Sequence, residues 1–278
     1  DPEDVMGRVF GGIESRTTGA PAAPRQGTQK NLAELDKMVK AGLERLYDFQ
    51  HSDGGWGWWK EGESDHWMTA YVLWGMLLAR DARITVKEDV LSRARDFLAK
   101  EIVEEEENPD MQAFMLHALV VYHAPFQDRM PGASIPKALD NLWSRRDALN
   151  AYTRALLALS AHHLNDAAKA RVLIENLENG VKRDERPDTS VLIGGQNIQH
   201  STLNTQHSTM GTAHWGEDGI YRRWSDGGVE ATAFALRALL TIDPKNKLIE
   251  PVTNWLIKNR RGAQWSNTRD TAIVVLAM

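Results

Sequence analysis

Acidic residues beside tryptophan-rich turns offer the first candidate chemistry. Six such acids precede apolar segments: Asp53, Asp65, Glu217, Asp218, Asp226 and Glu230. Two carboxylates about 5–10 Å apart across a cleft can hydrolyse a glycosidic bond, and neighbouring indoles such as Trp56, Trp58 and Trp59 would suit sugar stacking. Acids in these positions can also accept hydrogen bonds from amides at helix N-termini. We expect the capping role, and a carbohydrate hydrolase or lyase is the enzymatic alternative.

Histidines give weak evidence for a metal site, and cysteines give none. His200, His207 and His214 recur every seven residues, and imidazoles can bind zinc where a turn brings them together. In one extended strand the outer two would lie more than about 40 Å apart. The chain contains no cysteine, which excludes thiol catalysis and thiolate metal sites built from its own residues. We expect a polar surface hairpin, no catalytic residue, no metal and no cofactor.

Composition narrows the class of protein. The chain has 278 residues, of which 42% are hydrophobic and 26% charged, with a formal net charge of -5. These values are typical of a globular domain, and the negative charge argues against a nucleic-acid partner. No apolar run approaches the roughly 18 residues of a membrane span, so we expect no membrane insertion by this segment.

Amphipathic segments alternate with segments that are apolar on every side. The amphipathic ones are 32–49, 87–102, 135–143, 165–178 and 248–257, and the apolar ones are 66–79, 111–124, 147–159, 229–242 and 271–278. Helices with one apolar face form an outer layer around helices with no polar face. The pattern therefore predicts an all-α protein, an α/α toroid with inner and outer helix rings. Asp147 is expected to cap its helix.

Domain boundaries follow from the segments that lack this period. Residues 1–31, rich in Gly and Pro, are expected to be irregular, and residues 32–278 to form the toroid domain. An insertion at about 180–226, rich in Gly, Thr and His, contains pieces typical of strands such as Ser190 to Ile193. We expect this insertion to supply the small β-structure of the domain.

A short motif recurs three times, as stacked helical hairpins produce. Each copy has a Trp in a polar turn, then an acid, then Thr-Ala at the start of an apolar helix. The copies begin at Trp56, Trp224 and Trp265, their acids are Asp65, Glu230 and Asp270, and their Thr-Ala pairs begin at Thr69, Thr232 and Thr271. We expect these turns to join an outer helix to an inner one.

The same stretches resemble the thioester domain of bacterial alpha-macroglobulins. The resemblance rests on 46–59, 67–72, 231–233, 238–244, 254–256, 259–262, 265–266 and 268–272, in the family's order. It implies a complement-like α/α toroid. Its turn residues would be Gln50, Asp53, Gly54, Gly55, Trp56, Trp215, Trp224 and Trp265.

The resemblance also implies a Cys–Gln thioester in a C-x-E-Q-x-M stretch ahead of the helices. The candidate stretch is Asp1-Pro2-Glu3-Asp4-Val5-Met6. Aligned on Met6, Asp1 takes the place of the cysteine and Asp4 that of the glutamine, while Glu3 matches. A thioester needs a thiol and a carboxamide, and this pair supplies neither. We expect a homologue without the thioester, unless a cysteine lies upstream.

The resemblance implies a module without enzymatic activity in a larger alpha-macroglobulin-like protein. Its implied role is endopeptidase inhibition by protease trapping, or surface defence, and trapping without a thioester would be steric. The implied partners are other domains of the same chain and a target protease. The implied location is outside the cytoplasm: periplasmic, cell-surface or secreted. A protein-interaction scaffold is a third reading.

Overall fold

The computed structural model describes residues 27–124, 132–184, 211–216, 228–262 and 264–278. The chain divides into two compact units, residues 1–48 and 49–278. In the first unit, α2 runs over Gly27–Asp48 and therefore begins inside the segment expected to be irregular. Residues 27–31 contain no apolar side chain, so hydrophobic spacing could not reveal this part of the helix.

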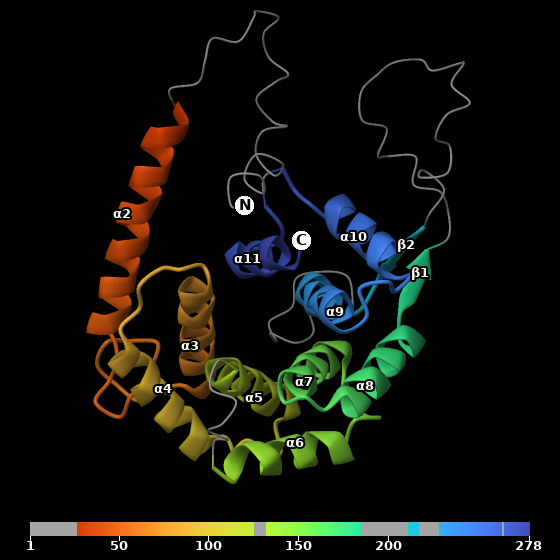
Figure 1. Ribbon diagram of the computed structural model, residues 1–278, viewed down its shortest axis with the longest axis horizontal. Coiled ribbons are helices and arrows are strands. Elements are labelled where there is room, and N and C mark those ends of the chain that lie inside the picture. Colours follow the sequence, from red (N-terminus) through yellow and green to blue (C-terminus); the bar gives the residue numbers. More distant parts are fainter. Residues whose placement is uncertain (1–26, 125–131, 185–210, 217–227, 263) are drawn as a thin grey trace, which may run out of the picture. The chain divides into compact units, whose positions relative to one another are not determined.

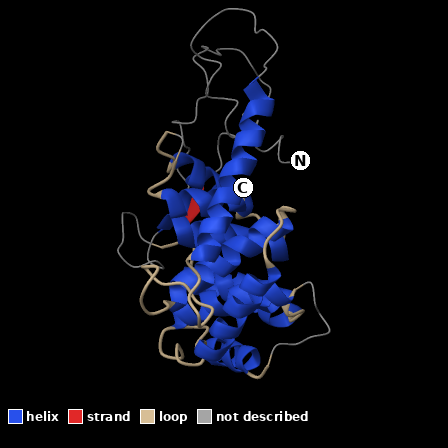
Figure 2. Cartoon of the chain, turned by 90° about the vertical axis from the view of Figure 1, so that its left-hand side faces the viewer, coloured by secondary structure: helices blue, strands red, loops and turns tan. Residues whose placement is uncertain are grey.

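The second unit has the predicted two layers of helices (Figure 1). Its inner helices are α3 (His66–Asp81), α5 (Pro109–His123), α7 (Ala151–His163), α9 (Gly228–Ile242) and α11 (Thr268–Ala277). Its outer helices are α4 (Glu88–Glu101), α6 (Ser134–Ser144), α8 (Ala167–Asn179) and α10 (Ile249–Lys258). Each inner helix packs against the next, and each outer helix packs against the inner helix before it. Figure 2 shows that helices make up nearly all the regular structure. The predicted all-α toroid class is confirmed.

Aromatic rings from four inner helices meet in the core of the second unit. Trp74 of α3 lies 5.7 Å from Phe234 of α9 and 5.9 Å from Phe114 of α5, measured between ring centroids. Tyr152 of α7 lies 5.4 Å from Phe234. All four rings are buried. Helices without a polar face pack against one another because their aromatic rings are shielded from water only in the core of the unit.

Asp or Asn side chains are the N-caps of four of the inner helices. Each accepts a hydrogen bond from the backbone N–H three residues later, which satisfies an amide that the helix leaves free. These N-caps are Asp65, Asn108, Asn150 and Asn267. The prediction that Asp147 caps α7 was wrong: the backbone between them forms a turn, and Arg154 donates a hydrogen bond to the Asp147 carbonyl.

Two short strands within the insertion form an antiparallel pair. β1 (Lys182–Asp184) pairs with β2 (Thr212–His214), and Lys182 lies opposite His214. The His214 ring stacks on Trp255 of α10 with centroids 4.5 Å apart and planes 6° apart. This pair of strands is the small β-structure that was expected. The strand-like piece at 190–193 lies outside the described residues.

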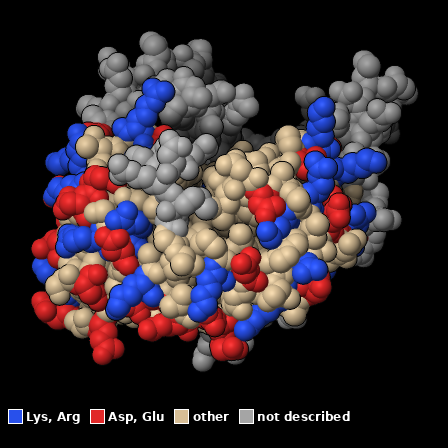
Figure 3. All heavy atoms as spheres, turned by 60° about the horizontal axis from the view of Figure 1, so that its bottom comes forward, with Lys and Arg blue, Asp and Glu red and all other residues tan. Residues whose placement is uncertain are grey.

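The surface carries charges of both signs. On the face drawn in Figure 3, where α4 and α6 come forward, Lys and Arg side chains are interspersed with Asp and Glu. Among the residues placed by the structure, no helix is both long enough and apolar enough to cross a bilayer.

Candidate functional site

The turn between residues 50 and 64 is the most densely bonded part of the predicted site. The Gln50 side-chain amide donates hydrogen bonds to the carbonyls of Gly54 and Val90, each at 2.9 Å, and so ties the turn to α4. Gly54 has a φ of +95°, and a Cβ there would lie 2.5 Å from the Arg93 carbonyl oxygen. Only glycine fits this conformation and this close approach.

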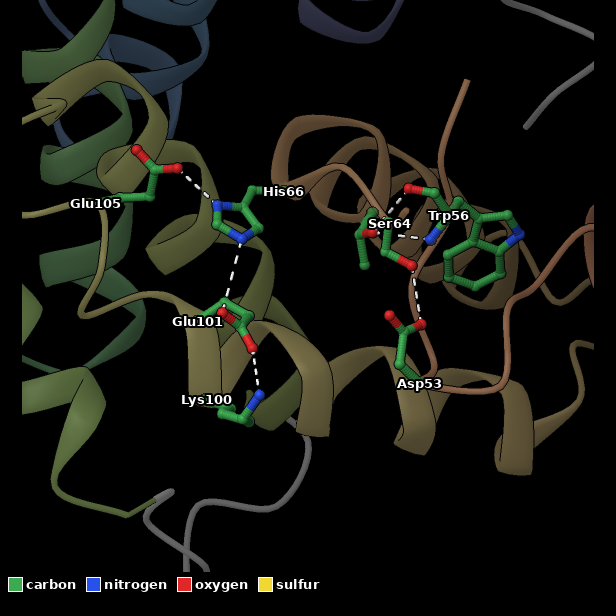
Figure 4. Close-up of polar contacts among 8 residues, drawn as sticks. Asp53, Trp56, Ser64, His66, Lys100, Glu101 and Glu105 are labelled. Atoms are coloured by element: carbon green, nitrogen blue, oxygen red, sulfur yellow. Dashed lines mark hydrogen bonds and ion pairs between the residues drawn. The ribbon is translucent and has the colours of Figure 1, made fainter. Parts of the chain in front are cut away.

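Polar side chains inside the turn bind one another. The Asp53 carboxylate accepts hydrogen bonds from the Gly55 amide at 2.9 Å and from the Ser64 hydroxyl at 2.8 Å (Figure 4). His51 places Nδ1 at 2.9 Å from the same hydroxyl and Nε2 at 3.0 Å from the Trp59 carbonyl oxygen. Asp53 therefore binds groups within the turn, and the N-cap of α3 is Asp65.

Three tryptophans are held by threonines of inner helices. The backbone N–H groups of Trp56, Trp215 and Trp265 donate to the hydroxyls of Thr69, Thr232 and Thr271 at 2.9, 3.0 and 3.0 Å. In the first two pairs the threonine hydroxyl also contacts the tryptophan carbonyl oxygen, at 3.2 Å. We call these three pairs the Trp–Thr latches.

The second latch corrects the repeat. Trp215 takes the place that the sequence assigned to Trp224, because Trp215 is the residue bonded to Thr232. Trp215 and Thr232 are 17 positions apart, whereas the partners in the first repeat are 13 apart, and this difference in spacing hid the correspondence. Trp224 lies outside the described residues.

Two latch indoles also reach the outer layer. The Trp215 ring N–H donates to the Leu177 carbonyl of α8 at 2.8 Å, and that of Trp265 donates to the Leu256 carbonyl of α10 at 2.7 Å. In each of these two residues the indole therefore donates a hydrogen bond to a carbonyl near the C-terminal end of an outer helix. The backbone of the same tryptophan binds the inner helix that follows. The indoles of Trp56, Trp215 and Trp265 are buried, whereas Trp58 and Trp59 are 64% and 77% exposed.

The acids of the three repeats differ in role. Asp65 accepts a hydrogen bond from the Met68 amide at 2.8 Å and is the N-cap of α3, so its predicted role is confirmed. Asp270 lies in the first turn of α11, where Asn267 is the cap, and its carboxylate accepts from the Asn267 side chain at 3.0 Å. The capping role predicted for Glu230 is wrong, because its carboxylate lies 2.7 Å from the Arg269 guanidinium and only 1% of its surface is exposed.

Burial sets the electrostatics around Glu230. Loss of hydration raises the pKa of Glu230 to about 8, against the lowering effect of Arg269, and Asp270 raises it further. Burial also raises the pKa of Tyr71 and that of Tyr152. The Arg269 guanidinium lies 5.7 Å from the Trp67 ring centroid. Arg269 of α11 therefore contacts both Glu230 of α9 and Trp67 of α3. The stretch 268–272 carried the family resemblance, but its spacing did not predict these contacts.

The glutamates at the end of α4 and in the turn after it are not all in solvent. A run of acids such as Glu101 and Glu104 to Glu107 is typical of a solvated helix end, but Glu101 is buried. Its carboxylate binds Lys100 at 2.6 Å and faces His66 Nε2 at 3.8 Å, while Glu105 contacts His66 Nδ1 at 2.6 Å (Figure 4). A run of like charges indicates a solvent-exposed segment only where no other element packs against it. Here α3 begins beside the glutamate run.

Several predicted residues fall outside the part of the chain that the structure describes. They are Asp1, Glu3 and Asp4 of the degenerate thioester stretch, His200 and His207 of the histidine series, the acids Glu217, Asp218 and Asp226, and Trp224. His214 is described, and it packs on Trp255.

Curated proteins resemble the chain over much of its length. An alpha-2-macroglobulin of Thermotoga maritima is 26% identical over 277 residues, which are 99% of this chain and 13% of that protein. An alpha-2-macroglobulin of Escherichia coli strain K12 is 24% identical over 177 residues, which are 59% of this chain and 10% of that protein. The chain thus spans a small fraction of these relatives.

Solved structures share the fold. Native alpha-2-macroglobulin of Escherichia coli, from domain MG7 to the C-terminus, superposes with a TM-score of 0.62 at 17% identity, over 88% of this chain and 34% of that one. Salmonella alpha-2-macroglobulin reacted with methylamine gives 0.61 at 16% identity, over 88% and 14%. The sequence profile described as "A-macroglobulin TED domain" matches residues 23–106 and 103–278. These matches, together with the two-layered helices, show that the chain belongs to the A-macroglobulin TED domain family.

Proposed function

We propose that this domain serves a larger alpha-macroglobulin-like protein that traps proteases without covalent capture. The observation that carries the proposal is the absence of cysteine from all 278 residues, although the family profile matches from residue 23 to residue 278. A thioester cannot form without a thiol. At Asp1 and Asp4 the chain offers carboxylates where the family resemblance implies a cysteine and a glutamine, while Glu3 matches the family's pattern.

The hydrogen bonds of the tryptophan-containing turns support a structural role for these turns. The Trp–Thr latches use the tryptophan backbone and indole to join helices. The carboxylates of Asp53 and Asp65 accept hydrogen bonds from nearby amides and a hydroxyl. Glu230 is paired and buried. A glycosidase needs two carboxylates facing substrate across a cleft. The observed contacts of these three acids favour a structural role in holding turns and helices together over a catalytic one.

Trapping without a thioester would be steric. The other domains of the protein would enclose a protease after cleavage, and this domain would move with them or support their contacts. The relatives are many times longer than this chain, which is consistent with such partners. We place the protein outside the cytoplasm, in the periplasm, at the cell surface or secreted, on the family resemblance.

Methylamine tests the proposal directly, because it opens a thioester, adds its own mass and frees a thiol. The full-length native protein is incubated with methylamine and assayed for new thiol and for added mass, with the Salmonella alpha-2-macroglobulin that reacts with methylamine as the positive control. We expect neither change. Release of one thiol per chain would overturn the proposal and locate a cysteine upstream of residue 1.

A protease challenge separates steric from covalent trapping. The full-length protein is mixed with a broad-specificity protease, and residual activity is measured on a large protein and on a small chromogenic peptide. Steric trapping protects the large substrate but not the small one, and denaturing gels show no adduct. Equal cleavage of both substrates, or an adduct that survives denaturation, contradicts the proposal.

A further inference from the structure

Three metal-ligating side chains meet where α3 begins and α4 ends. The donor atoms of His66, Glu101 and Glu104 all lie within 4.8 Å of one another. We propose that His66 Nε2 and the carboxylates of Glu101 and Glu104 bind one divalent transition-metal ion, with Zn²⁺ as the best fit. The inference does not depend on the proposed function.

The backbone positions these ligands before any ion arrives. His66 is the first residue of α3, Glu101 is the last residue of α4, and Glu104 lies in the turn that follows. The Glu104 amide donates to the Glu101 carbonyl at 2.9 Å, and the Gln112 side chain donates to the Ile102 carbonyl at 3.2 Å. The turn is therefore fixed to α4 on one side and to α5 on the other, which lowers the entropy cost of bringing the ligands together.

The histidine is oriented as metal-bound histidines are. Its Nδ1 lies 2.6 Å from a Glu105 carboxylate oxygen, and its ring packs against Phe97 with centroids 5.9 Å apart. With Nδ1 engaged, Nε2 faces the Glu101 carboxylate at 3.8 Å (Figure 4). A carboxylate on the outer nitrogen fixes the tautomer that leaves Nε2 free to bind a metal.

Charge favours a divalent cation. Glu101, Glu104 and Glu105 bring three carboxylates, and Lys100, which contacts Glu101 at 2.6 Å, supplies one ammonium group. With neutral His66, two negative charges remain for the ion to balance. Lys100 is 82% exposed, so its chain can turn into solvent when an ion binds Glu101.

The donor set selects the kind of metal. One imidazole and two carboxylates suit Zn²⁺ and neighbouring transition ions, whereas Mg²⁺ and Ca²⁺ prefer oxygen ligands alone. Three protein ligands leave at least one coordination position for water. The competing reading is an ion pair between protonated His66 and Glu105, with no metal.

Calorimetry with ZnCl₂ in chelator-free buffer distinguishes the two readings. The full-length protein is compared with His66→Asn, Glu101→Gln and Glu105→Gln, and with Glu175→Gln, an exposed acid of α8, as the matched control. We expect one class of zinc site to disappear in the first two variants and to weaken about 10- to 100-fold in the third. The control should bind as the wild type does. Thermal melts without metal establish that each variant is folded.

Lys100→Met supplies a test that a folding defect cannot mimic. Removing the ammonium that competes for Glu101 should tighten zinc binding several-fold if the ion binds this carboxylate. The proposal is overturned if the wild type takes up no zinc, or if His66→Asn, Glu101→Gln and Lys100→Met all bind zinc with unchanged stoichiometry and affinity. An unchanged site would then belong to other residues.

Discussion

The start of α3 and the start of α9 carry the same motif and use it differently. Both have a Trp–Thr latch with nearly identical distances, Trp56 with Thr69 and Trp215 with Thr232. At α3 the acid is Asp65, which faces the edge of the protein and caps the helix. At α9 the acid is Glu230, which is buried against Arg269.

The difference shows that the threonine hydroxyl, and not the acid, is the constant part of the repeat. A hydroxyl that binds the Trp backbone needs one position on the helix, so it recurs in register. The acids stand four, two and one residues before their threonines at Asp65, Glu230 and Asp270. A shift of two residues along a helix moves a side chain by about 200° around its axis, from a solvated edge to the interior.

Removing Arg269 should have the largest effect on this comparison. Arg269→Ala leaves the buried Glu230 side chain without its partner. At about pH 9, above the Glu230 pKa of about 8, this side chain is ionised, and breaking such a buried pair costs about 3–5 kcal/mol. Urea denaturation of the variant measures the loss, with the exposed Arg261→Ala as a control expected to change stability by less than about 0.5 kcal/mol. Equal, small effects in both variants would mean that the ion pair contributes little.

The pH dependence of the free energy of unfolding should distinguish the buried Glu230 from the capping Asp65. The pKa of Glu230 rises from 4.5 to about 8 on folding, so the folded state holds its proton more tightly. Its contribution to stability is complete below pH 4.5 and is lost as the pH rises to about 8, by a few kcal/mol at most. Denaturation of wild type and Glu230→Gln across this range should show a decline that the variant lacks. Parallel curves would contradict the buried-acid assignment.

The latches should contribute equally at the two helices. Thr69→Val and Thr232→Val keep the shape of the side chain but leave the Trp amide without its acceptor, at a cost of about 1–3 kcal/mol each. Thermal or urea melts of the pair should agree within about 0.5 kcal/mol, and Thr→Ser at either position should recover most of the loss. A large effect at one latch alone would show that the repeats are not equivalent.

The cap at Asp65 should give the smallest effect. Asp65→Ala removes the acceptor for the Met68 amide and should cost about 1 kcal/mol, whereas Asp65→Asn, also a good N-cap, should cost a few tenths. Urea melts of both variants provide the measurement. A loss of several kcal/mol from Asp65→Asn would indicate that the charge has a role beyond capping.

Much of the fold was accessible from local patterns. The buried helix at Trp74 was predicted from its unbroken apolar run, and its ring is in the core. The start of α2 was missed because residues 27–31 have no apolar spacing to detect. The burial of Glu101 could not be predicted because four further acids follow closely at 104–107, and only the packing of α3 beside α4 brings His66 over it.

The sequence by itself determined the alternation of helix types, the recurrence of the latch and the lack of a thiol, because these depend on composition and short-range spacing. The tertiary structure decided which tryptophan enters the second latch, which acid is buried, and that Arg269 reaches Glu230. Those outcomes depend on contacts between segments far apart in the chain. Their burial, and with it the pKa of Glu230, is set by the helices that surround each group and not by its neighbours in sequence.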